Sequence, residues 1–212
     1  MPGAPSTPSR RTRRDVNLEA TRATIVAGAG RLFLARGYGG TTLGDIAAEA
    51  SVAVQTIYNA VGGKAAVLTA LFEATVAGEG VARSVPEIMR ERTRQVKDAR
   101  GLVRLLAEWF TDVHQRMAAL WQVIEEGAAH HPEVAAFARE RSLRRLANYE
   151  EAARELKRRG GVVGLELDEV AALIWSVGHP RTWQALVVER GWTPDRYRRW
   201  VERALGAALL RP

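Results

Sequence analysis

The stretch over residues 42–64 constrains the fold of this chain more strongly than any other part of it. Thr42 can cap the first turn of a helix, and Asp45 is the reciprocal partner that a capping box requires three residues later. Ser51 can break that helix, and a second short helix is expected over residues 54–59. The outer face of this second helix is polar but uncharged. Two short helices joined by a tight turn, the second with such a face, are typical of proteins that read the major groove of DNA.

Residue type and spacing follow one pattern on both sides of the turn. The pattern occupies Ile25, Ala29, Leu32, Phe33, Arg36, Gly37, Tyr38, Thr41, Thr42, Ile46, Ala47, Ala50, Val52, Thr56, Ile57, Tyr58, Lys64, Val67 and Leu68. At these positions the sequence resembles the tetracycline-repressor-like (TetR) family of transcriptional regulators. A second run resembles the last two helices of one TetR subgroup, at Pro180, Trp183, Leu186, Val187, Arg190, Gly191, Trp192, Pro194, Tyr197 and Trp200.

The sequence departs from the TetR pattern within the turn itself. Ser51, Ala53 and Gln55 stand where the family commonly has Gly, Ser and Gly, and Val61 stands where Phe is usual. These changes leave the apolar positions of the two short helices in place. We therefore expect the turn and its core to be retained and the base-reading surface to be atypical.

Helical periodicity continues through the rest of the chain, and no run alternates with a period of two. The expected fold class is all-α, with an N-terminal three-helix helix-turn-helix domain and a C-terminal helical bundle that dimerises and holds a ligand pocket. Residues 81–100 are charged, with little periodicity, and are expected to form a variable connection. Asp168 is expected to cap a later helix, and Gly178-His179-Pro180 is expected to break it.

The expected domains are residues 1–17, 18–66 and 67–212. The first is a flexible basic arm, because a segment rich in Pro, Ser and Arg cannot build a core. Its arginines, which either follow DNA phosphates, reach into a minor groove or form a solvated tail, are Arg10, Arg11, Arg13 and Arg14. The second is the helix-turn-helix domain, and the third is the ligand-binding and dimerisation domain.

The resemblance assigns the second short helix to the major groove. It implies base or near-base contacts by Val54, Gln55, Thr56 and Asn59, and phosphate contacts by Thr42, Tyr58 and Lys64. Gln55 is the most informative of them, because its amide can pair bidentately with adenine. The alternative is that Thr56 and Tyr58 only pack and cap. A dimer would place two such helices about 34–36 Å apart, so the expected operator is a palindrome.

The resemblance also implies an effector pocket inside the C-terminal bundle. Its candidates are Trp109, Phe110, His114, Met117, Trp121, Trp175 and His179. Aromatic side chains with a few polar groups suit an apolar or aromatic small molecule. The alternative is that these residues are simply core. Four arginines of the same region, Arg139, Arg141, Arg144 and Arg145, are interpreted as a solvated outer face.

The last two helices imply a homodimer, since the family builds a four-helix interface from them. The interface candidates in this sequence are Trp183, Leu186, Val187, Tyr197, Trp200 and Leu205. A small molecule in the bundle would move the helix over residues 64–78 and change the spacing of the two reading heads. This expectation comes from the family and not from the spacing of residues.

Composition excludes several other classes of protein. There are no cysteines, so disulfides and thiolate metal sites are absent, and no apolar run reaches the roughly 18 residues of a membrane span. The net charge of +7 suits phosphate attraction. None of the four histidines lies in a His-Glu-x-x-His motif, and a metal site at His130, His131 and Glu133 is only weakly indicated. We expect no catalytic residues, no metal and no cofactor.

The sequence therefore predicts a ligand-responsive, cytoplasmic transcriptional regulator with no membrane partner. The expected action is that of a repressor, which binds double-stranded DNA as a homodimer and is released by a small molecule. The alternative from another class is a helical small-molecule-binding protein whose N-terminal domain no longer binds a specific operator. Sequence-specific DNA binding that depends strongly on salt separates these two functions.

Overall fold

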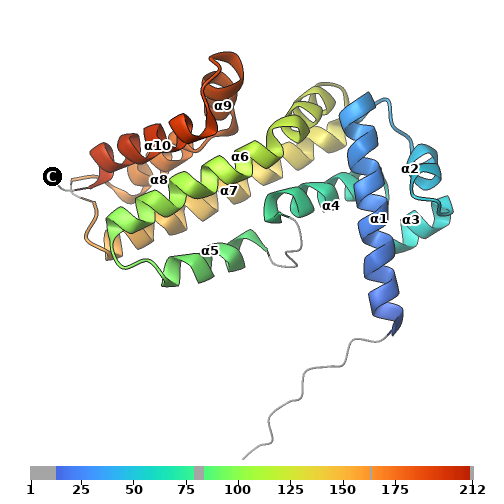
Figure 1. Cartoon of the computed structure of the whole chain (residues 1–212), viewed down its shortest axis with the longest axis horizontal. Helices are drawn as coiled ribbons and strands as arrows, with labels where there is room; N and C mark the ends of the chain where they lie inside the picture. The colour runs from blue at the N-terminus through green and yellow to red at the C-terminus, as the bar shows by residue number, and fades with distance from the viewer. Residues whose placement is uncertain (1–12, 79–83, 163, 211–212) are drawn as a thin grey trace, which may run out of the picture. The chain divides into compact units, whose positions relative to one another are not determined.

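A computed structural model describes residues 13–78, 84–162 and 164–210 of the chain, and all regular structure in these ranges is helical. The expected all-α fold class is confirmed. The chain forms two compact units, which divide between Leu71 and Phe72. Figure 1 shows the helices of each unit, coloured from blue at the N-terminus to red at the C-terminus.

The first unit contains three helices and the start of a fourth: α1 (Arg13–Arg36), α2 (Leu43–Glu49), α3 (Val54–Ala60) and α4 (Lys64–Ala77). Helices α1, α2 and α3 all pack against one another. The interior side chains come from each of these elements and are fully buried, at Ile25, Ala29, Phe33, Ile46, Ile57 and Val67. The apolar stripe of α1 therefore supports the two short helices, as helical spacing predicts.

Helix α1 begins earlier than the sequence pattern indicated. Arg13–Asn17, which were expected to belong to a flexible arm, form the first turns of α1. The rest of that arm, with Arg10 and Arg11, lies outside the described residues. Residues 13–17 contain neither Pro nor Gly, so nothing in them stops the helix from extending beyond its apolar stripe.

The second unit is a bundle built on two long helices. Its elements after α4 are α5 (Val85–Arg94), α6 (Ala99–His130), α7 (Pro132–Arg158), α8 (Leu167–Val177), α9 (Pro180–Trp183), the π-helix η1 (Gln184–Glu189) and α10 (Pro194–Leu209). Helices α6 and α7 lie side by side in Figure 1, α8 packs on α7, and α10 packs on α6. The bundle core is formed where these four helices meet.

Two expectations about helix boundaries are wrong. The connection expected over residues 81–100 contains α5, which Ser84 starts through a capping box with Glu87. Helix α8 is capped by Glu166 and not by Asp168, which lies in its first turn. The backbone N–H of Glu166 donates to Glu169 at 2.8 Å, so the helix starts before Asp168. In both cases a glutamate three residues after the cap closes the box, a signal that the sequence pattern contained.

Candidate functional site

The two short helices of the first unit meet at a well-defined turn. Thr42 caps α2, and the side chain of Asp45 accepts a 2.8 Å hydrogen bond from the Thr42 backbone N–H, which confirms the expected capping box. Ser51 then adopts a left-handed backbone conformation, with φ of 53°. The Val52 N–H donates to the Ala47 carbonyl at 2.9 Å and closes the turn. The turn is thus retained although Ser51 replaces the usual glycine.

Helix α3 presents a polar face to solvent and one apolar side chain to the core. Ile57 is fully buried, whereas Tyr58 is 53% exposed and Val54 is 39% exposed. Gln55 and Asn59 are exposed, and the Gln55 side-chain amide donates to the side-chain oxygen Oδ1 of Asn59 at 3.1 Å. We call Val54, Gln55, Tyr58 and Asn59 the α3 outer face. It is uncharged, rich in donors and acceptors, and held on a helix anchored by Ile57.

The other three residues expected to contact DNA have additional local contacts. Thr56 is half-buried. The Thr42 hydroxyl lies 2.5 Å from a carboxylate oxygen of Asp45, so a phosphate contact would have to replace that hydrogen bond. This hydrogen bond is the main reason why the pKa of Asp45 is lowered. The Lys64 ammonium lies 4.1 Å from the centroid of the Tyr38 ring, which holds it near the start of α4.

His114 lies at the centre of the bundle and is almost completely buried. Its Nε2 atom is 3.0 Å from the carbonyl oxygen of Gly178, which also accepts a 3.3 Å hydrogen bond from the Tyr149 hydroxyl. Burial lowers the pKa of His114 to about 4. The ring is therefore neutral at pH 7, and Nε2 carries the proton because a carbonyl can only accept. Nδ1 is buried and has no hydrogen-bond partner among the described residues.

Aromatic rings surround His114 on several sides. Trp183 lies 5.9 Å and Tyr197 6.3 Å away between ring centroids, and Phe110 also lies at 6.3 Å. Burial raises the pKa values of Tyr149 and Tyr197, so both hydroxyls stay protonated. The buried Nε1–H of Trp183 lacks an acceptor within the described chain. The centre of the bundle is thus apolar with a few neutral polar groups.

Trp121 belongs to a second group at another position along α6. Its ring lies 5.6 Å from Phe72 of α4, and the Arg145 guanidinium lies 5.5 Å from the Trp121 ring. Arg141 is placed over the rings of Phe72 and Phe137, at 5.2 and 5.1 Å. Arg141 and Arg145 therefore point toward α6 and α4, and the interpretation of these two arginines as part of a solvated outer face is wrong.

The residues expected in one ligand pocket differ in their immediate contacts. Phe110 and His114 form the central group, and Trp121 lies with the two arginines. Trp175 packs on His179 at 4.6 Å, and Trp109 lies beneath Arg92. Met117 is fully buried. Burial and the positive charges of Arg145 and Arg181 lower the pKa of His179 to about 4.

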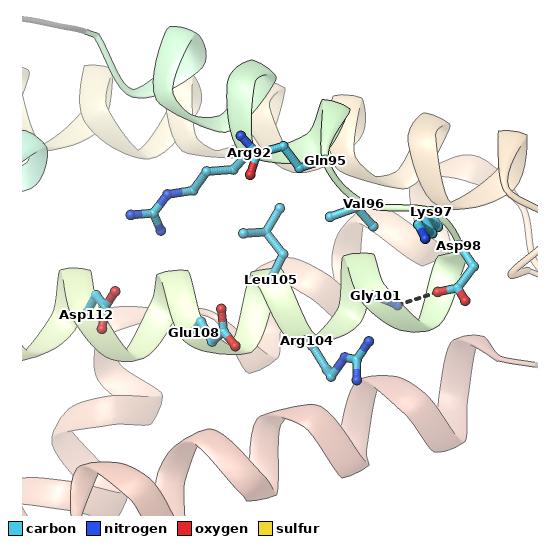
Figure 2. A pocket seen from close by; sticks show the side chains of 10 residues that line it. All are labelled: Arg92, Gln95, Val96, Lys97, Asp98, Gly101, Arg104, Leu105, Glu108 and Asp112. Carbon is cyan, nitrogen blue, oxygen red and sulfur yellow. Dashed lines mark hydrogen bonds between the residues drawn. The ribbon is translucent and has the colours of Figure 1, made fainter.

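A hollow of about 720 Å³ lies elsewhere in the bundle, between α5 and the first half of α6. Figure 2 shows its lining, which contains charged groups of both signs. The lining consists of Arg92, Gln95, Val96, Lys97, Asp98, Gly101, Arg104, Leu105, Glu108 and Asp112. None of the residues expected to hold a ligand is among them. This hollow lacks the apolar walls of a site for an aromatic compound.

The six residues expected at a dimer interface form two sets, three that are buried and three that are half-buried. Trp183, Tyr197 and Leu205 are almost fully buried inside one protomer, at 4%, 0% and 1% exposure, so a partner could not contact them directly. Leu186, Val187 and Trp200 are half-buried. Val188, which sequence reasoning did not select, is 48% exposed beside them on η1.

Two other types of site find no counterpart in the described ranges. His130, His131 and Glu133 do not form a metal-binding group, and no set of three His, Cys, Asp or Glu side chains does so elsewhere in these ranges. Of the helices described, none is by itself long and apolar enough to cross a membrane, although the bent pair Val54–Ala60 and Lys64–Ala77 passes that test when taken together.

Comparisons with known proteins point to one family. Residues 25–71 match the family model described as bacterial regulatory proteins, tetR family, and no curated protein matches the chain. NalD, the secondary repressor of the MexAB-OprM multidrug efflux pump in Pseudomonas aeruginosa, is 20% identical, with a TM-score of 0.72 over 92% of this chain and 98% of its own.

Two further solved structures have the same fold. A protein assigned to the TetR family from Mesorhizobium loti MAFF303099 is 18% identical, with a TM-score of 0.67 over 93% of this chain and 96% of its own. A protein assigned as a transcriptional regulator from Saccharomonospora viridis, in complex with choline, is 20% identical, with a TM-score of 0.63 over 92% of this chain and all of its own. Residues 25–71 thus match the tetR family of bacterial regulatory proteins, and the chain as a whole has the fold of these solved structures.

Proposed function

We propose that this chain is a ligand-responsive transcriptional repressor that binds a palindromic operator as a homodimer and is released by a small molecule. The α3 outer face carries the proposal. Gln55 and Asn59 are exposed amides on consecutive turns of a helix, and each can offer a donor and an acceptor to base edges. Tyr58 and Lys64 flank them as candidates for phosphate contacts, and Thr42 joins them if its hydrogen bond to Asp45 is exchanged.

Apolar surface on the last helices supports a homodimer. Val188 is 48% exposed on η1, and Leu186, Val187 and Trp200 are half-buried. A second copy would cover these side chains, while Trp183, Tyr197 and Leu205 would support the surface from inside the protomer. Two α3 helices related by a two-fold axis read inverted repeats, about 34–36 Å apart.

Contacts at the end of α4 support release by a small molecule. The Arg116 guanidinium of α6 donates to the carbonyl oxygens of Thr75 and Val76, at 3.2 and 3.0 Å. Phe72 packs on Trp121 and Phe137. A ligand that rearranges α6 or α7 would therefore move α4, the helix that begins next to α3. That the choline complex and NalD share this fold supports a regulator of this kind.

Selection of bound fragments from sheared genomic DNA at near-physiological salt tests the proposal. We expect one inverted-repeat motif with the wild-type chain and loss of that motif with Gln55→Ala/Asn59→Ala. Arg139→Gln, an exposed change in α7, is the matched control and should recover the wild-type motif. Diffuse binding that vanishes as salt rises would contradict the proposal and favour a small-molecule-binding protein without a specific operator.

A further inference from the structure

The inner face of α7 contains two arginines within an apolar stripe. Phe137, Arg141, Arg145 and Tyr149 follow one another at intervals of four residues, which places them on one side of the helix. Phe137 and Tyr149 are buried, at 8% and 7% exposure. The two arginines between them are half-buried. A charge in such a position needs a partner of opposite charge, because desolvation is costly.

Only one of the two arginines has such a partner within the described chain. Arg141 pairs with Glu73 of α4 at 3.3 Å. Arg145 forms no ion pair with any described Asp or Glu, and its Nε–H is buried without an acceptor. Burial lowers the pKa of Arg145, yet a guanidinium remains charged at neutral pH. Arg145 is thus a half-buried cation that lies over the Trp121 ring, 5.5 Å from its centroid.

Other donors near Arg145 also lack acceptors. The Nε1–H of Trp121 and the Nε–H of Arg141 are both buried without a hydrogen-bond partner in the described ranges. The charge of Arg145 contributes to lowering the pKa values of His114 and His179, so the local potential is positive. Three unsatisfied N–H groups on two adjacent helices call for a group that is rich in acceptors and negatively charged.

We propose that the effector of this regulator carries a carboxylate, which Arg145 binds, and an aromatic or apolar body, which packs beside Trp121. This inference rests on the proposed function, because it names the chemical class of the small molecule that function requires. Both Arg145 and Trp121 are half-buried, so the group is within reach of solvent after side-chain movement. A carboxylate offers two acceptor oxygens in the planar geometry that a guanidinium fork matches.

The same group connects the carboxylate to α4. Trp121 contacts Phe72 at 5.6 Å, and Phe72 lies under Arg141. An anion that draws Arg145 away from the Trp121 ring changes the packing of Trp121 on Phe72. The other arginine, which pairs with Glu73 of the same helix, is coupled to this change. Binding at Arg145 therefore acts on the last turns of α4.

Matched probes of different charge test the inference on the full-length chain. Benzoate, phenylacetate and octanoate are compared with their neutral amides and with phenyltrimethylammonium, by calorimetric titration and by tryptophan fluorescence. We expect at least one carboxylate to bind tenfold or more tightly than its amide, and the cation not to bind. Arg145→Gln should remove the preference, whereas Arg139→Gln, which deletes an exposed charge from the same helix, should keep it.

A second measurement separates binding from a structural role. Arg145→Met keeps an unbranched, apolar side chain and removes the unpaired charge, so its melting temperature without any probe should equal or exceed that of the wild type. A lower melting temperature would mean that Arg145 stabilises the fold and would overturn the inference. Equal binding of carboxylates and amides, no binding of any carboxylate, or unchanged binding by Arg145→Gln would overturn it as well.

The two proposals can fail independently. Release of a selected operator by a neutral compound, with no effect of the carboxylates, would leave the repressor in place and refute the anionic effector. Carboxylate binding that depends on Arg145, without any operator motif in the DNA selection, would refute the repressor and keep the anion site. The binding measurements need no operator, so their result does not depend on the DNA selection.

Discussion

His114 Nε2 lies 3.0 Å from the carbonyl oxygen of Gly178, the residue that caps the C-terminal end of α8. The contact joins the middle of α6 to the break before α9, across 64 residues of sequence. Tyr149 of α7 donates to the same carbonyl. Three helices therefore depend on one backbone oxygen, and both donors must keep their protons.

Stability should fall in mild acid because His114 is buried in the neutral form. The pKa of His114 is lowered from 6.5 to about 4, so the unfolded chain takes up a proton near pH 6.5 and the folded chain only near pH 4. The contribution is complete above pH 6.5 and is lost as the pH falls toward 4. Between pH 7 and pH 5 the wild type should lose about 2 kcal/mol through this group.

Denaturant unfolding of His114→Gln at both pH values checks this expectation. The amide can still donate to Gly178 but does not titrate, so the loss between pH 7 and pH 5 should be smaller by about 2 kcal/mol. His130→Gln, at an exposed position at the end of α6, serves as the control and should behave as the wild type. An equal loss of stability in His114→Gln and the wild type would show that His114 is already protonated in the folded state at pH 5.

Gly178→Ala should destabilise the bundle by about 1–3 kcal/mol through overpacking. A Cβ atom at this position would lie 2.5 Å from two carbons of the Phe110 ring, which is held between Tyr149 and His114. Gly206→Ala in α10 is the control, since its nearest neighbour would lie at 3.8 Å. Calorimetry should show a lower melting temperature than the wild type for Gly178→Ala and no decrease for Gly206→Ala. A decrease for Gly206→Ala alone would disprove the packing argument.

Ser51→Gly should stabilise the first unit. Ser51 has a φ of 53°, a conformation that costs non-glycine residues roughly 1–2 kcal/mol. Glycine avoids this cost, but its greater freedom in the unfolded chain offsets part of the gain in stability. We expect a net gain of about 0.5–1 kcal/mol. Hydrogen exchange of the α2 and α3 amides measures it. Ser51→Ala, which retains a Cβ, should bring no gain, and equal protection in all three proteins would exclude strain at this turn.

Gln55 and Asn59 should act on DNA as a coupled pair. The Gln55 amide donates to Asn59 at 3.1 Å, so removing either side chain leaves the other with a different orientation. A double-mutant cycle of operator affinity with Gln55→Ala and Asn59→Ala should show an interaction energy of about 0.5–3 kcal/mol. Additive losses would mean that the two amides read DNA independently.

Lys64→Ala provides the contrast in the same assay. Its ammonium is proposed to contact phosphate, so the variant should weaken binding to all duplexes alike and reduce the salt slope by about 1. Its effect should add to that of Gln55→Ala. A loss confined to the selected operator would instead assign Lys64 to base readout.

Much of the first unit follows from short-range chemistry. The capping box of Thr42 and Asp45, the break at Ser51 and the inward position of Ile57 involve residues within a few positions of one another. Such interactions are encoded locally, so the sequence sufficed to predict them.

The bundle interior required contacts between distant helices. Helical spacing places Arg141 and Arg145 on one face of α7, but it does not say whether that face meets solvent or α6. Long arginine stems pack well on aromatic rings, and here Trp121, Phe72 and Phe137 supply those rings from three helices. Only the tertiary structure therefore shows which of the two arginines, Arg145, is without an acidic partner among the described residues.

The sequence by itself determined the all-α fold, the helix-turn-helix and the outer residues of α3, because helical period and caps are local properties. Only the tertiary structure decided that Tyr197 and Leu205 lie inside the protomer, that Glu166 starts α8, and that Arg145 has no acidic partner among the described residues. Burial and ion pairing depend on which helices pack together. A one-dimensional pattern does not contain that information, since one apolar stripe can face several different neighbours.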